Sequence, residues 1–251
     1  MLSDSKLVLI TGASRGIGRA CAESAASAGY AVAVTYTERA GAADEVVTRI
    51  RSAGGKAKAF KADISVESDV LALFSALDDE PEPLTGLINN AAILDQQTRL
   101  DGMSASRMAR IFEVNILGTF LCTREAVRRM STTHGGQGGA IVNISSMASR
   151  LGSPNEYIDY AASKGAVDTL TIGLSKEVAA EGIRVNGVRP GLIYTDMHAS
   201  SGEAGRVDRL KSSVPMQRGG QAHEVAAAAL WLLSEEASYV TGTFIDTAGG
   251  R

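Results

Sequence analysis

Residues 6–29, KLVLITGASRGIGRACAESAASAG, decide the fold of this chain. Their apolar start predicts a short buried strand over Lys6–Thr11. Glycines follow from Gly12 at the spacing Gly-x-x-x-Gly-x-Gly, and small residues at helical spacing then run to Gly29, a common helix-ending residue type. Glycines between a strand and a helix let the backbone approach a pyrophosphate, whose charge the helix amino terminus favours. The stretch therefore predicts a dinucleotide-binding turn.

The alternation of strand and helix continues along the chain. Further strands are predicted over Ala31–Tyr36, Lys56–Lys61, Leu84–Asn89, Ala140–Ser145, Ile183–Arg189 and Thr243–Asp246. Helices are predicted over Gly41–Ser52, after Asp63 through Leu77, over Met103–Met130 as one long or broken helix, over Tyr160–Ala180 and over His223–Leu233. Seven strands separated by helices predict a single α/β domain over residues 1–251. Its architecture is expected to be a Rossmann-like, doubly wound parallel sheet with helices on both faces and ligands at the carboxyl ends of the strands.

The composition limits the function classes. The chain has 251 residues, of which 45% are hydrophobic and 21% charged, with a net charge of −3. These values are ordinary for one large α/β domain, and the absence of a basic run argues against nucleic-acid binding. The apolar runs Leu7–Ile10 and Val225–Leu233 are too short for a signal peptide core and a membrane span, respectively.

The metal-ligating residue types are few and scattered. Cys21 and Cys122 fall in predicted helices without metal-binding spacing, which favours reduced cysteines in a cytoplasmic protein. His134, His198 and His223 lie far apart in the sequence, so no metal site is expected.

Tyr160 and Lys164 form the candidate catalytic pair. Residues four apart lie on one face of a helix, so the ammonium is expected beside the phenol. A nearby cation is expected to lower the phenol pKa from its ordinary value of about 10, which favours proton exchange with a carbonyl or alcohol oxygen. Ser145 or Ser146, one of which faces the site because strand residues alternate, offers a hydroxyl to the same oxygen. Tyr157 lacks a lysine four residues later, and the alternative for Tyr160 is a surface tyrosine packed on a lysine stem.

Taken together, these residues resemble the short-chain dehydrogenase/reductase family over essentially the whole chain. The motifs that carry the resemblance are Thr11-Gly-x-x-x-Gly-x-Gly18, Asp63, Asn89-Asn90-Ala91, Asn115, Ser146, Tyr160-x-x-x-Lys164 and Pro190-Gly191-x-Ile193-x-Thr195. The resemblance implies NAD(P)(H)-dependent hydride transfer between an alcohol and a carbonyl. It also implies the roles. Tyr160 would be the acid/base and Ser146 would polarise the substrate oxygen. Lys164 would bind the nicotinamide ribose and lower the tyrosine pKa, and Asn115 would anchor a proton relay.

The expected cofactor contacts follow from the same resemblance and from the charges near the glycine turn. They are Gly12, Ser14, Arg15, Gly16, Ile17, Gly18, Tyr36, Arg39, Asp63, Ile64, Asn90, Ala91, Tyr160, Lys164, Pro190, Gly191, Ile193 and Thr195. The chain departs from the family where Asn-Asn-Ala-Gly ends in Ala92, which puts the loop near the ribose in question. It looks like a bacterial subgroup loosely labelled sugar dehydrogenases or general oxidoreductases. The family commonly forms homotetramers through long helices, on which Phe120, Leu121, Leu170 and Leu174 lie here.

The second predicted strand favours NADP(H) over NAD(H). NAD-preferring folds usually place an acid at the end of this strand to bind the ribose hydroxyls, and here the strand ends in Tyr36. Arg15 in the turn and Arg39 after the strand can clamp a 2′-phosphate. Glu38 is evidence for NAD(H), which stays an alternative.

Residues 192–220 are predicted to form a lid over the substrate. The segment is polar, rich in small residues and placed after a strand end, although a plain surface loop is the alternative. Its basic residues, which suggest either an acidic substrate or solvated charges, are Arg206, Arg209, Lys211 and Arg218. A mildly apolar substrate pocket is predicted from Ile93, Met147, Leu151, Tyr157 and Met197.

Two other function classes compete with the dehydrogenase. Gly12-x-Ser14-x-Gly16 matches a hydrolase nucleophile elbow, and His134-Gly-Gly resembles an oxyanion loop. In hydrolases, however, the oxyanion loop precedes the nucleophile, and here it follows. The other alternative is a catalytically silent nucleotide-binding sensor or scaffold, which needs no proton donor such as Tyr160.

Overall fold

The apolar runs of the sequence become the strands of one parallel sheet in the computed structural model, which describes residues 6–197 and 201–251. The strands are β1 (Leu7–Ile10), β2 (Ala31–Tyr36), β3 (Lys56–Lys61), β4 (Leu84–Asn89), β5 (Gly139–Ile144), β6 (Ile183–Pro190) and β9 (Phe244–Thr247). They form a seven-stranded sheet in the order β3-β2-β1-β4-β5-β6-β9, and every neighbouring pair is parallel. The predicted seven-stranded, doubly wound sheet is confirmed.

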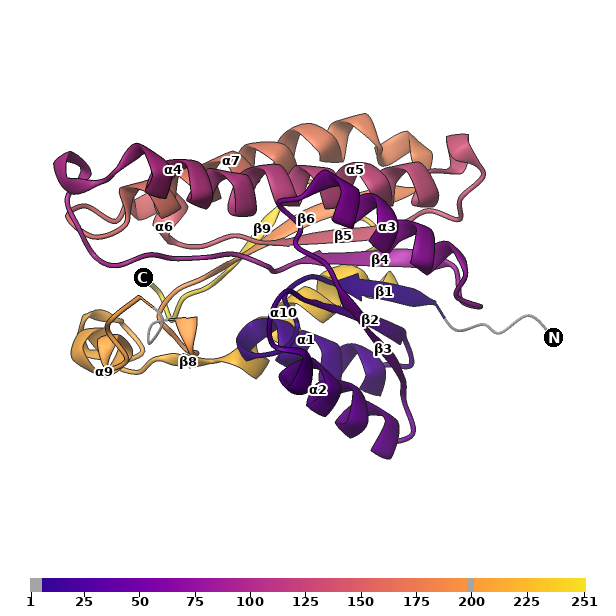
Figure 1. The fold of residues 1–251 in the computed structure, drawn as a ribbon, viewed down its shortest axis with the longest axis horizontal. Helices are drawn as coiled ribbons and strands as arrows, with labels where there is room; N and C mark the ends of the chain where they lie inside the picture. The colour runs from indigo at the N-terminus through magenta and orange to yellow at the C-terminus, as the bar shows by residue number, and fades with distance from the viewer. Residues whose placement is uncertain (1–5, 198–200) are drawn as a thin grey trace.

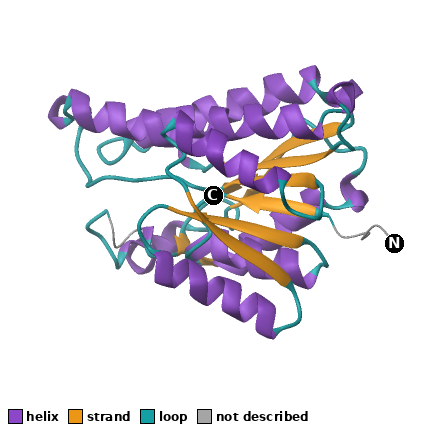
Figure 2. Ribbon diagram, turned by 45° about the vertical axis from the view of Figure 1, so that its right-hand side comes forward, coloured by secondary structure: helices purple, strands orange, loops and turns teal. Residues whose placement is uncertain are grey.

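Helices cover both faces of this sheet (Figures 1 and 2). One face carries α1 (Gly16–Ser27), α2 (Ala40–Ser52) and α10 (Ala222–Leu233), and the other carries α3 (Glu67–Asp78), α4 (Ala105–Phe112), α5 (Thr119–Met130) and α7 (Ile158–Glu177). Shorter helical turns are η1 (Leu100–Gly102), η3 (Thr132–His134), α6 (Ala148–Leu151), η4 (Ala179–Glu181), η5 (Lys211–Ser213) and η6 (Glu235–Ala237). Among the described residues, no helix has both the length and the apolarity that a membrane crossing requires.

Alternation along the strands divides the core into two layers. Val8 and Ile10 of β1 pack with α1, α2 and α10, whereas Leu7 and Leu9 pack in the layer beneath α3 and α5. Because both faces are covered, β1 is buried throughout and reads as a continuous apolar run rather than an alternating one.

The structure refines two predicted segments. The predicted helix Met103–Met130 is broken by a π-helical stretch, η2 (Glu113–Gly118), between α4 and α5. The two ends of the 192–220 segment lie side by side, because β7 (Ile193–Tyr194) and β8 (Gly220–Gln221) pair in parallel. The short helix α9 (Arg206–Leu210) lies between these strands in the sequence. Residues 198–200 of this segment, including His198, lie outside the described residues.

A chain of buried hydrogen bonds fixes the helix α7 against the middle of the sheet. The Asn89 amide nitrogen of β4 donates to Thr123 Oγ1 of α5 and to Asn143 Oδ1 of β5, each at 2.8 Å. The Asn143 amide in turn donates to Thr171 Oγ1 of α7 at 2.8 Å. These bonds therefore fix the positions of two strands and two helices relative to one another, because polar groups buried in an apolar core need hydrogen-bond partners.

We expect the substitution Asn143→Ala to lower the free energy of unfolding by about 1–3 kcal/mol, because it leaves the Asn89 amide and the Thr171 hydroxyl short of a buried partner. Denaturant unfolding measures the change. Thr169→Ala, which removes an exposed hydroxyl from the same helix, is the control and should change stability by less than about 0.5 kcal/mol. An Asn143→Ala protein as stable as the control would contradict the role given to this chain of bonds.

Candidate active site

The glycine turn between β1 and α1 needs glycine for two different reasons. Gly12 has a φ of +63°, and a Cβ there would lie 2.9 Å from the Cα of Ala91. Gly18 has ordinary helical geometry, but a Cβ on it would overlap the Asn90 amide nitrogen. The backbone of the turn is therefore packed directly against the end of β4, with no room for side chains.

Hydrogen bonds from neighbouring strand ends hold this turn in place. The Thr11 hydroxyl accepts the backbone N–H groups of Asn90 and Ala91, each at 3.0 Å. The Asn90 side-chain amide donates to the carbonyl oxygens of Thr11 at 2.9 Å and Gly12 at 3.0 Å. The Thr35 hydroxyl at the end of β2 accepts the Gly12 N–H at 3.0 Å. Thr11 and Thr35 were not predicted as positioning residues, although a threonine at each strand end beside the turn was the available signal.

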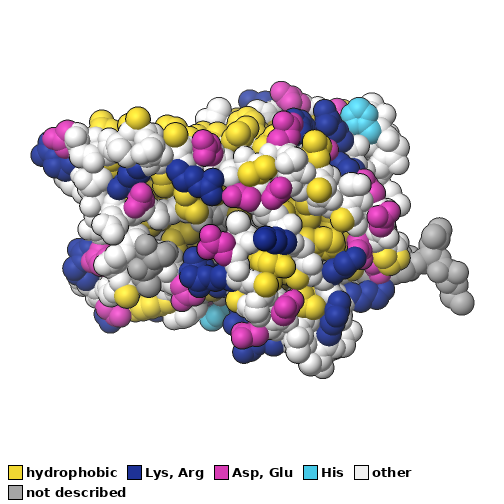
Figure 3. Space-filling view, in the orientation of Figure 1, with side chains coloured by type: hydrophobic (Ala, Val, Ile, Leu, Met, Phe, Trp, Pro, Cys, Tyr) yellow, Lys and Arg dark blue, Asp and Glu magenta, His cyan; other side chains and the backbone are white. Residues whose placement is uncertain are grey.

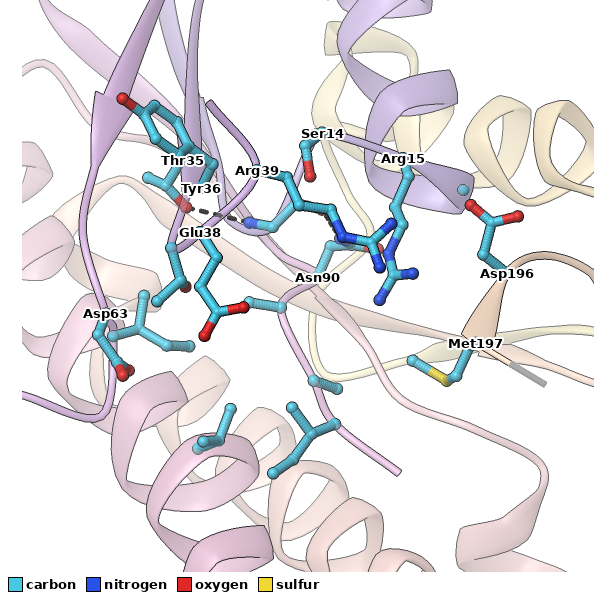
Figure 4. A pocket seen from close by; sticks show the side chains of 18 of the residues that line it. Ser14, Arg15, Thr35, Tyr36, Glu38, Arg39, Asp63, Asn90, Asp196 and Met197 are labelled. Carbon is cyan, nitrogen blue, oxygen red and sulfur yellow. Dashed lines mark hydrogen bonds between the residues drawn. The ribbon is translucent and has the colours of Figure 1, made fainter. Parts of the chain in front are cut away.

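A first cavity of about 360 Å³ opens over the turn (Figure 4). Its lining includes the predicted cofactor contacts Gly12, Ser14, Arg15, Gly16, Ile17, Tyr36, Arg39, Asp63, Ile64, Asn90, Ala91 and Thr195. Gly18 lies buried below the turn and lines neither this cavity nor the next. The first turn of α1 carries no acidic residue and no side-chain cap, so its N–H groups are available to an anion. These features fit the pyrophosphate of a dinucleotide.

Two guanidinium groups define one end of the first cavity. Figure 4 shows the side chains of Arg15 and Arg39 directed toward the same part of the cavity, whereas the Tyr36 ring is directed away from them. Neither arginine forms an ion pair or a side-chain hydrogen bond with any residue in the described part of the chain. Glu38 also lines this region. Asp196 lines the cavity beside Arg15, so this region presents two cations without an ion pair in the described part of the chain and the carboxylates of Glu38 and Asp196.

Asp63 lies at the opposite side of the first cavity, where protein groups already hold its carboxylate. It accepts the Ser65 N–H at 3.0 Å, the Ser65 hydroxyl at 2.6 Å and the Arg110 guanidinium at 3.3 Å. Burial opposes ionisation of this carboxyl, but the bonds from Ser65 and Arg110 outweigh burial and lower its pKa. Asp63 therefore faces the cavity as a fixed anion.

A second cavity, of about 340 Å³, brings the predicted catalytic residues together. Ser146 follows β5, while Tyr160 and Lys164 lie in the first two turns of α7, and all three line this cavity. The Ser146 hydroxyl lies near enough to the Tyr160 phenol to lower its pKa. The Ser145 hydroxyl instead donates to the Asp168 carboxylate at 2.6 Å. Both serines line the cavity, but the Ser145 hydroxyl is engaged by Asp168, and Ser146 as the hydroxyl that acts with the tyrosine stays a prediction.

Burial dominates the protonation of the tyrosine–lysine pair. It raises the pKa of Tyr160 to about 12, and the nearby Ser146 hydroxyl offsets only part of that shift. The expected lowering of the tyrosine pKa by Lys164 is therefore wrong for the protein's own groups. Burial also lowers the pKa of Lys164 to about 8, against the favourable charge of Asp168. The lysine nitrogen lies 5.6 Å from the centre of the Tyr160 ring and donates to the Ile144 carbonyl at 2.8 Å, and within the described residues it forms no hydrogen bond with the phenol.

Asn115 lies behind the cavities rather than in them. It is fully buried in η2, where its Oδ1 accepts the Ile93 N–H at 2.8 Å. Its amide donates to the Ile93 carbonyl at 3.0 Å and to Ser163 Oγ at 3.1 Å, and the Ser163 hydroxyl donates to the Tyr160 carbonyl at 2.7 Å. The side chain thus joins the loop after β4 to the catalytic helix. The proton relay implied by the resemblance stays a prediction.

The two cavities form one trough, because they share lining residues at the carboxyl edge of the sheet. The shared residues are Ile17, Asn90, Ala92, Thr195 and Met197. Pro190, Gly191 and Ile193 continue the lining of the second cavity, and their predicted contact with the cofactor stays a prediction. Of the predicted apolar pocket, Met147, Leu151, Tyr157 and Met197 line the second cavity, but Ile93 lines the first.

Described residues of the 192–220 segment line the second cavity, among them Leu192, Ile193 and Arg206. Arg206 of α9 lines it, with both terminal nitrogens bound to the Glu156 carboxylate at 2.8 and 2.5 Å and its guanidinium 5.2 Å from the Tyr157 ring. The predicted solvated alternative is wrong for Arg206, whose side chain is 9% exposed. Arg209, Lys211 and Arg218 are exposed and paired with nearby carboxylates.

The geometry argues against the hydrolase alternative. Ser14 follows β1 at the carboxyl edge of the parallel sheet, whereas His134 precedes β5 at the amino edge and is exposed. The two side chains therefore lie at opposite edges of the sheet, out of reach of each other. Within residues 6–197 and 201–251, no group of three or more histidine, cysteine, aspartate or glutamate side chains is placed to hold a metal ion.

We expect the substitution Lys164→Met to stabilise the protein at neutral pH. A shift from 10.5 to about 8 means that the buried charge costs up to roughly 3 kcal/mol below pH 8, and methionine has no charge to bury. The unfolded chain keeps this proton to higher pH than the folded protein, so the free energy of unfolding of the wild type should rise between pH 8 and 10.5. The difference in stability between Lys164→Met and the wild type should therefore shrink over this range.

Denaturant unfolding at pH 7 and pH 10 measures this gap, with Lys176→Met, an exposed lysine of the same helix, as the control. A variant less stable than the wild type at pH 7, or a gap that does not change with pH, would contradict the predicted burial cost.

Comparison with known proteins agrees with this geometry. The family model described as enoyl-(acyl carrier protein) reductase matches residues 12–251. The chain is 62% identical over 245 residues to the "Uncharacterized oxidoreductase YgfF" of Escherichia coli (strain K12), covering 98% of this chain and 99% of that protein. It is 36% identical over 246 residues to glucose 1-dehydrogenase 2 of Bacillus subtilis (strain 168), with 98% and 94% covered.

A solved structure has the same architecture. It is a short chain dehydrogenase from Burkholderia cenocepacia J2315 in complex with NADP, which superposes with a TM-score of 0.88 at 31% identity over 98% of this chain and 97% of that one. The fold, the glycine turn and the family match agree over nearly the whole chain. The chain therefore belongs to the short-chain dehydrogenase/reductase family and is an oxidoreductase.

Proposed function

We propose that the protein interconverts a carbonyl compound and a secondary alcohol and that it prefers NADP(H) to NAD(H). The observation that carries the proposal is the continuous trough, which runs from the two uncommitted arginines over the glycine turn to Ser146, Tyr160 and Lys164. A dinucleotide laid along it would have its phosphates at the amino terminus of α1 and its nicotinamide end beside the tyrosine. When bound, the nicotinamide supplies or accepts the hydride.

In this proposal, Tyr160 is the proton donor for carbonyl reduction. With a pKa of about 12 from the protein's own groups, the phenol is protonated at neutral pH. The Ser146 hydroxyl lines the same cavity, so both hydroxyls can donate to one carbonyl oxygen. Polarisation of that oxygen favours attack at the carbonyl carbon, and transfer of the phenolic proton gives the alcohol. Lys164 provides a buried ammonium next to the cavity for the ribose.

The preference for NADP(H) rests on charge. A 2′-phosphate would meet Arg15 and Arg39, which have no competing ion pair among the described residues, and it would meet no acid at the end of β2. Asp63 lies across the cavity, with its carboxylate engaged by Ser65 and Arg110. The NADP in the Burkholderia structure supports the same choice. NAD(H) remains the alternative through Glu38.

The substrate is expected to be a small carbonyl compound covered by the 192–220 segment acting as a lid. The second cavity combines apolar side chains with the Glu156–Arg206 ion pair at its side. The similarity to a glucose 1-dehydrogenase makes sugars one class to test, beside ketones, aldehydes and 3-oxoacyl thioesters.

We also propose that the protein forms a homotetramer in the cytoplasm. Phe112, Leu117, Phe120 and Ile172 leave 37–48% of their surface exposed on α4, η2, α5 and α7, and Figure 3 shows apolar side chains along this edge of the molecule. Leu121, which was also expected on this surface, is instead a core residue at 6% exposure. Burial raises the pKa values of the Cys21 and Cys122 thiols to about 12, which makes them unreactive and suits a reducing compartment.

We expect Tyr160→Phe to abolish at least about 99% of turnover, because positioned proton transfer typically contributes about 10²–10⁴-fold. NADPH binding should change little, since the ring is kept. Loss of nicotinamide absorbance across the four carbonyl classes measures turnover, and cofactor fluorescence measures binding. Wild-type turnover in this variant would remove Tyr160 from the mechanism. Tight binding without turnover by the wild type would favour the sensor or scaffold.

We expect Arg39→Glu to weaken NADPH binding by about 10–100-fold, the loss of about 1.5–3 kcal/mol that a charged hydrogen bond supplies. NADH binding should change by less than about threefold, because it has no 2′-phosphate. Arg49→Glu, on the exposed surface of the same α2 helix, makes the same charge change away from the cavity and is the control. Equal losses for the two cofactors would contradict the phosphate clamp.

A further inference from the structure

We infer that the ion pair between Arg107 and Asp159 is a positioning pair that sets the location of the Tyr160 phenol. Asp159 immediately precedes Tyr160 in the first turn of α7, and Arg107 reaches it from α4. The inference rests on the proposed role of Tyr160 and adds residues that touch neither cavity.

The pair is buried and two-pronged. Arg107 Nε donates to Asp159 Oδ2 at 2.7 Å, and its Nη2 donates to Asp159 Oδ1 at 3.3 Å. The two side chains are 11% and 1% exposed, respectively. A guanidinium bound through two parallel bonds fixes the orientation as well as the distance of the carboxylate. Asp159 Oδ1 also accepts the backbone N–H of Tyr160 at 2.9 Å, so the clamp reaches the backbone of the proton donor itself.

Arg107 also holds the loop that leaves β4. Its Nη1 donates to the Gln96 carbonyl at 2.5 Å, and its Nε lies 4.0 Å from the Asp95 carboxylate. The same loop is joined to the residues before α7, because Thr98 N–H donates to the Glu156 carbonyl at 3.1 Å. One side chain therefore sets the spacing between α4, this loop and the start of α7.

The pair matches the clamp made by Asn115 one helical turn further along. Asn115 joins Ile93 of the same loop to Ser163 of α7, as Arg107 joins Gln96 to Asp159. Asp159 and Ser163 are four residues apart, as are Tyr160 and Lys164, so one helix face is held while the adjacent face lines the cavity.

The start of α7 depends on the contacts that Arg107 and Asn115 make with it. The N-cap residue, Tyr157, makes no side-chain capping bond, so no cap fixes the first turn in the usual way. Two clamps four residues apart fix both the rotation and the position of the helix, and a shift of about 1 Å at a catalytic group can cost about 10²-fold in rate. We therefore expect the loss of Arg107 and Asp159 to lower kcat and to leave the binding of substrate and cofactor nearly unchanged.

The test is the double variant Arg107→Met/Asp159→Asn. It leaves no unpaired buried charge, and the asparagine keeps an acceptor for the Tyr160 N–H, so the fold is expected to survive. We expect kcat on the best carbonyl substrate to fall by about 10–100-fold, with KM and the NADPH Kd within about threefold of wild type. Arg107→Lys, which keeps one bond to Asp159, should recover part of the loss.

The matched control is Arg129→Met/Asp78→Asn. This pair is also two-pronged, at 2.6 and 2.8 Å, but joins α5 to α3 away from the cavities, so kcat should stay at the wild-type level. Wild-type kcat in a folded Arg107→Met/Asp159→Asn protein would overturn the inference. If that protein does not fold, Arg107→Lys decides: a threefold to tenfold lower kcat at unchanged KM supports the inference, and an unchanged kcat overturns it.

Failure of the proposed function gives a different result. In that case the wild type turns over none of the carbonyl classes, or Tyr160→Phe stays fully active. An active wild type that requires Tyr160, together with a fully active double variant, would remove only the positioning pair.

Discussion

Hydrogen bonds between the ends of β1 and β4 are the constraint on which the rest of the site depends. Thr11 and Asn90 exchange backbone and side-chain bonds across the two strands, and the Asn90 amide also holds the Gly12 carbonyl. This is the point where the strand order reverses direction from β1, so the two halves of the sheet diverge there and leave a crevice. Because the turn is packed against β4 without side chains, the amino terminus of α1 opens directly into that crevice.

The catalytic end of the crevice depends on burial, which acts on the phenol and the ammonium in opposite ways. It holds Tyr160 in its neutral, proton-donating form and makes the Lys164 charge costly, with pKa values of about 12 and 8. Asp168 partly supports that charge from the same helix, and it is itself bound by Ser145 and Arg189 at 2.6 and 2.9 Å. Ser145 thus contributes by orienting the carboxylate behind the lysine.

Much of this arrangement could be predicted from the sequence, because strands, helices and turns are local patterns. All seven strands of the sheet were predicted, and the spacing of Tyr160 and Lys164 on α7 predicted that both lie at one site. What could not be predicted depends on contacts between distant residues. The raised pKa of Tyr160 follows from the burial of its phenol by residues that are distant in the sequence. The spacing of residues along one helix does not reveal that burial. The sequence allowed a broken helix over Met103–Met130 but did not locate the break at η2, where Asn115 bonds to Ile93 and Ser163.

The catalytic helix shows why a motif and a working site are different things. The residues 160 and 164 form the pattern that sequence comparison recognises, but they lie on only one face of α7. The adjacent face, through Asp159 and Ser163, receives a buried arginine and a buried asparagine from the helices beside it. A phenol that must meet a substrate oxygen within a few tenths of an ångström needs its helix fixed in rotation as well as in position. In this fold the recognised face supplies the chemistry, and the adjacent face supplies the accuracy with which that chemistry is placed.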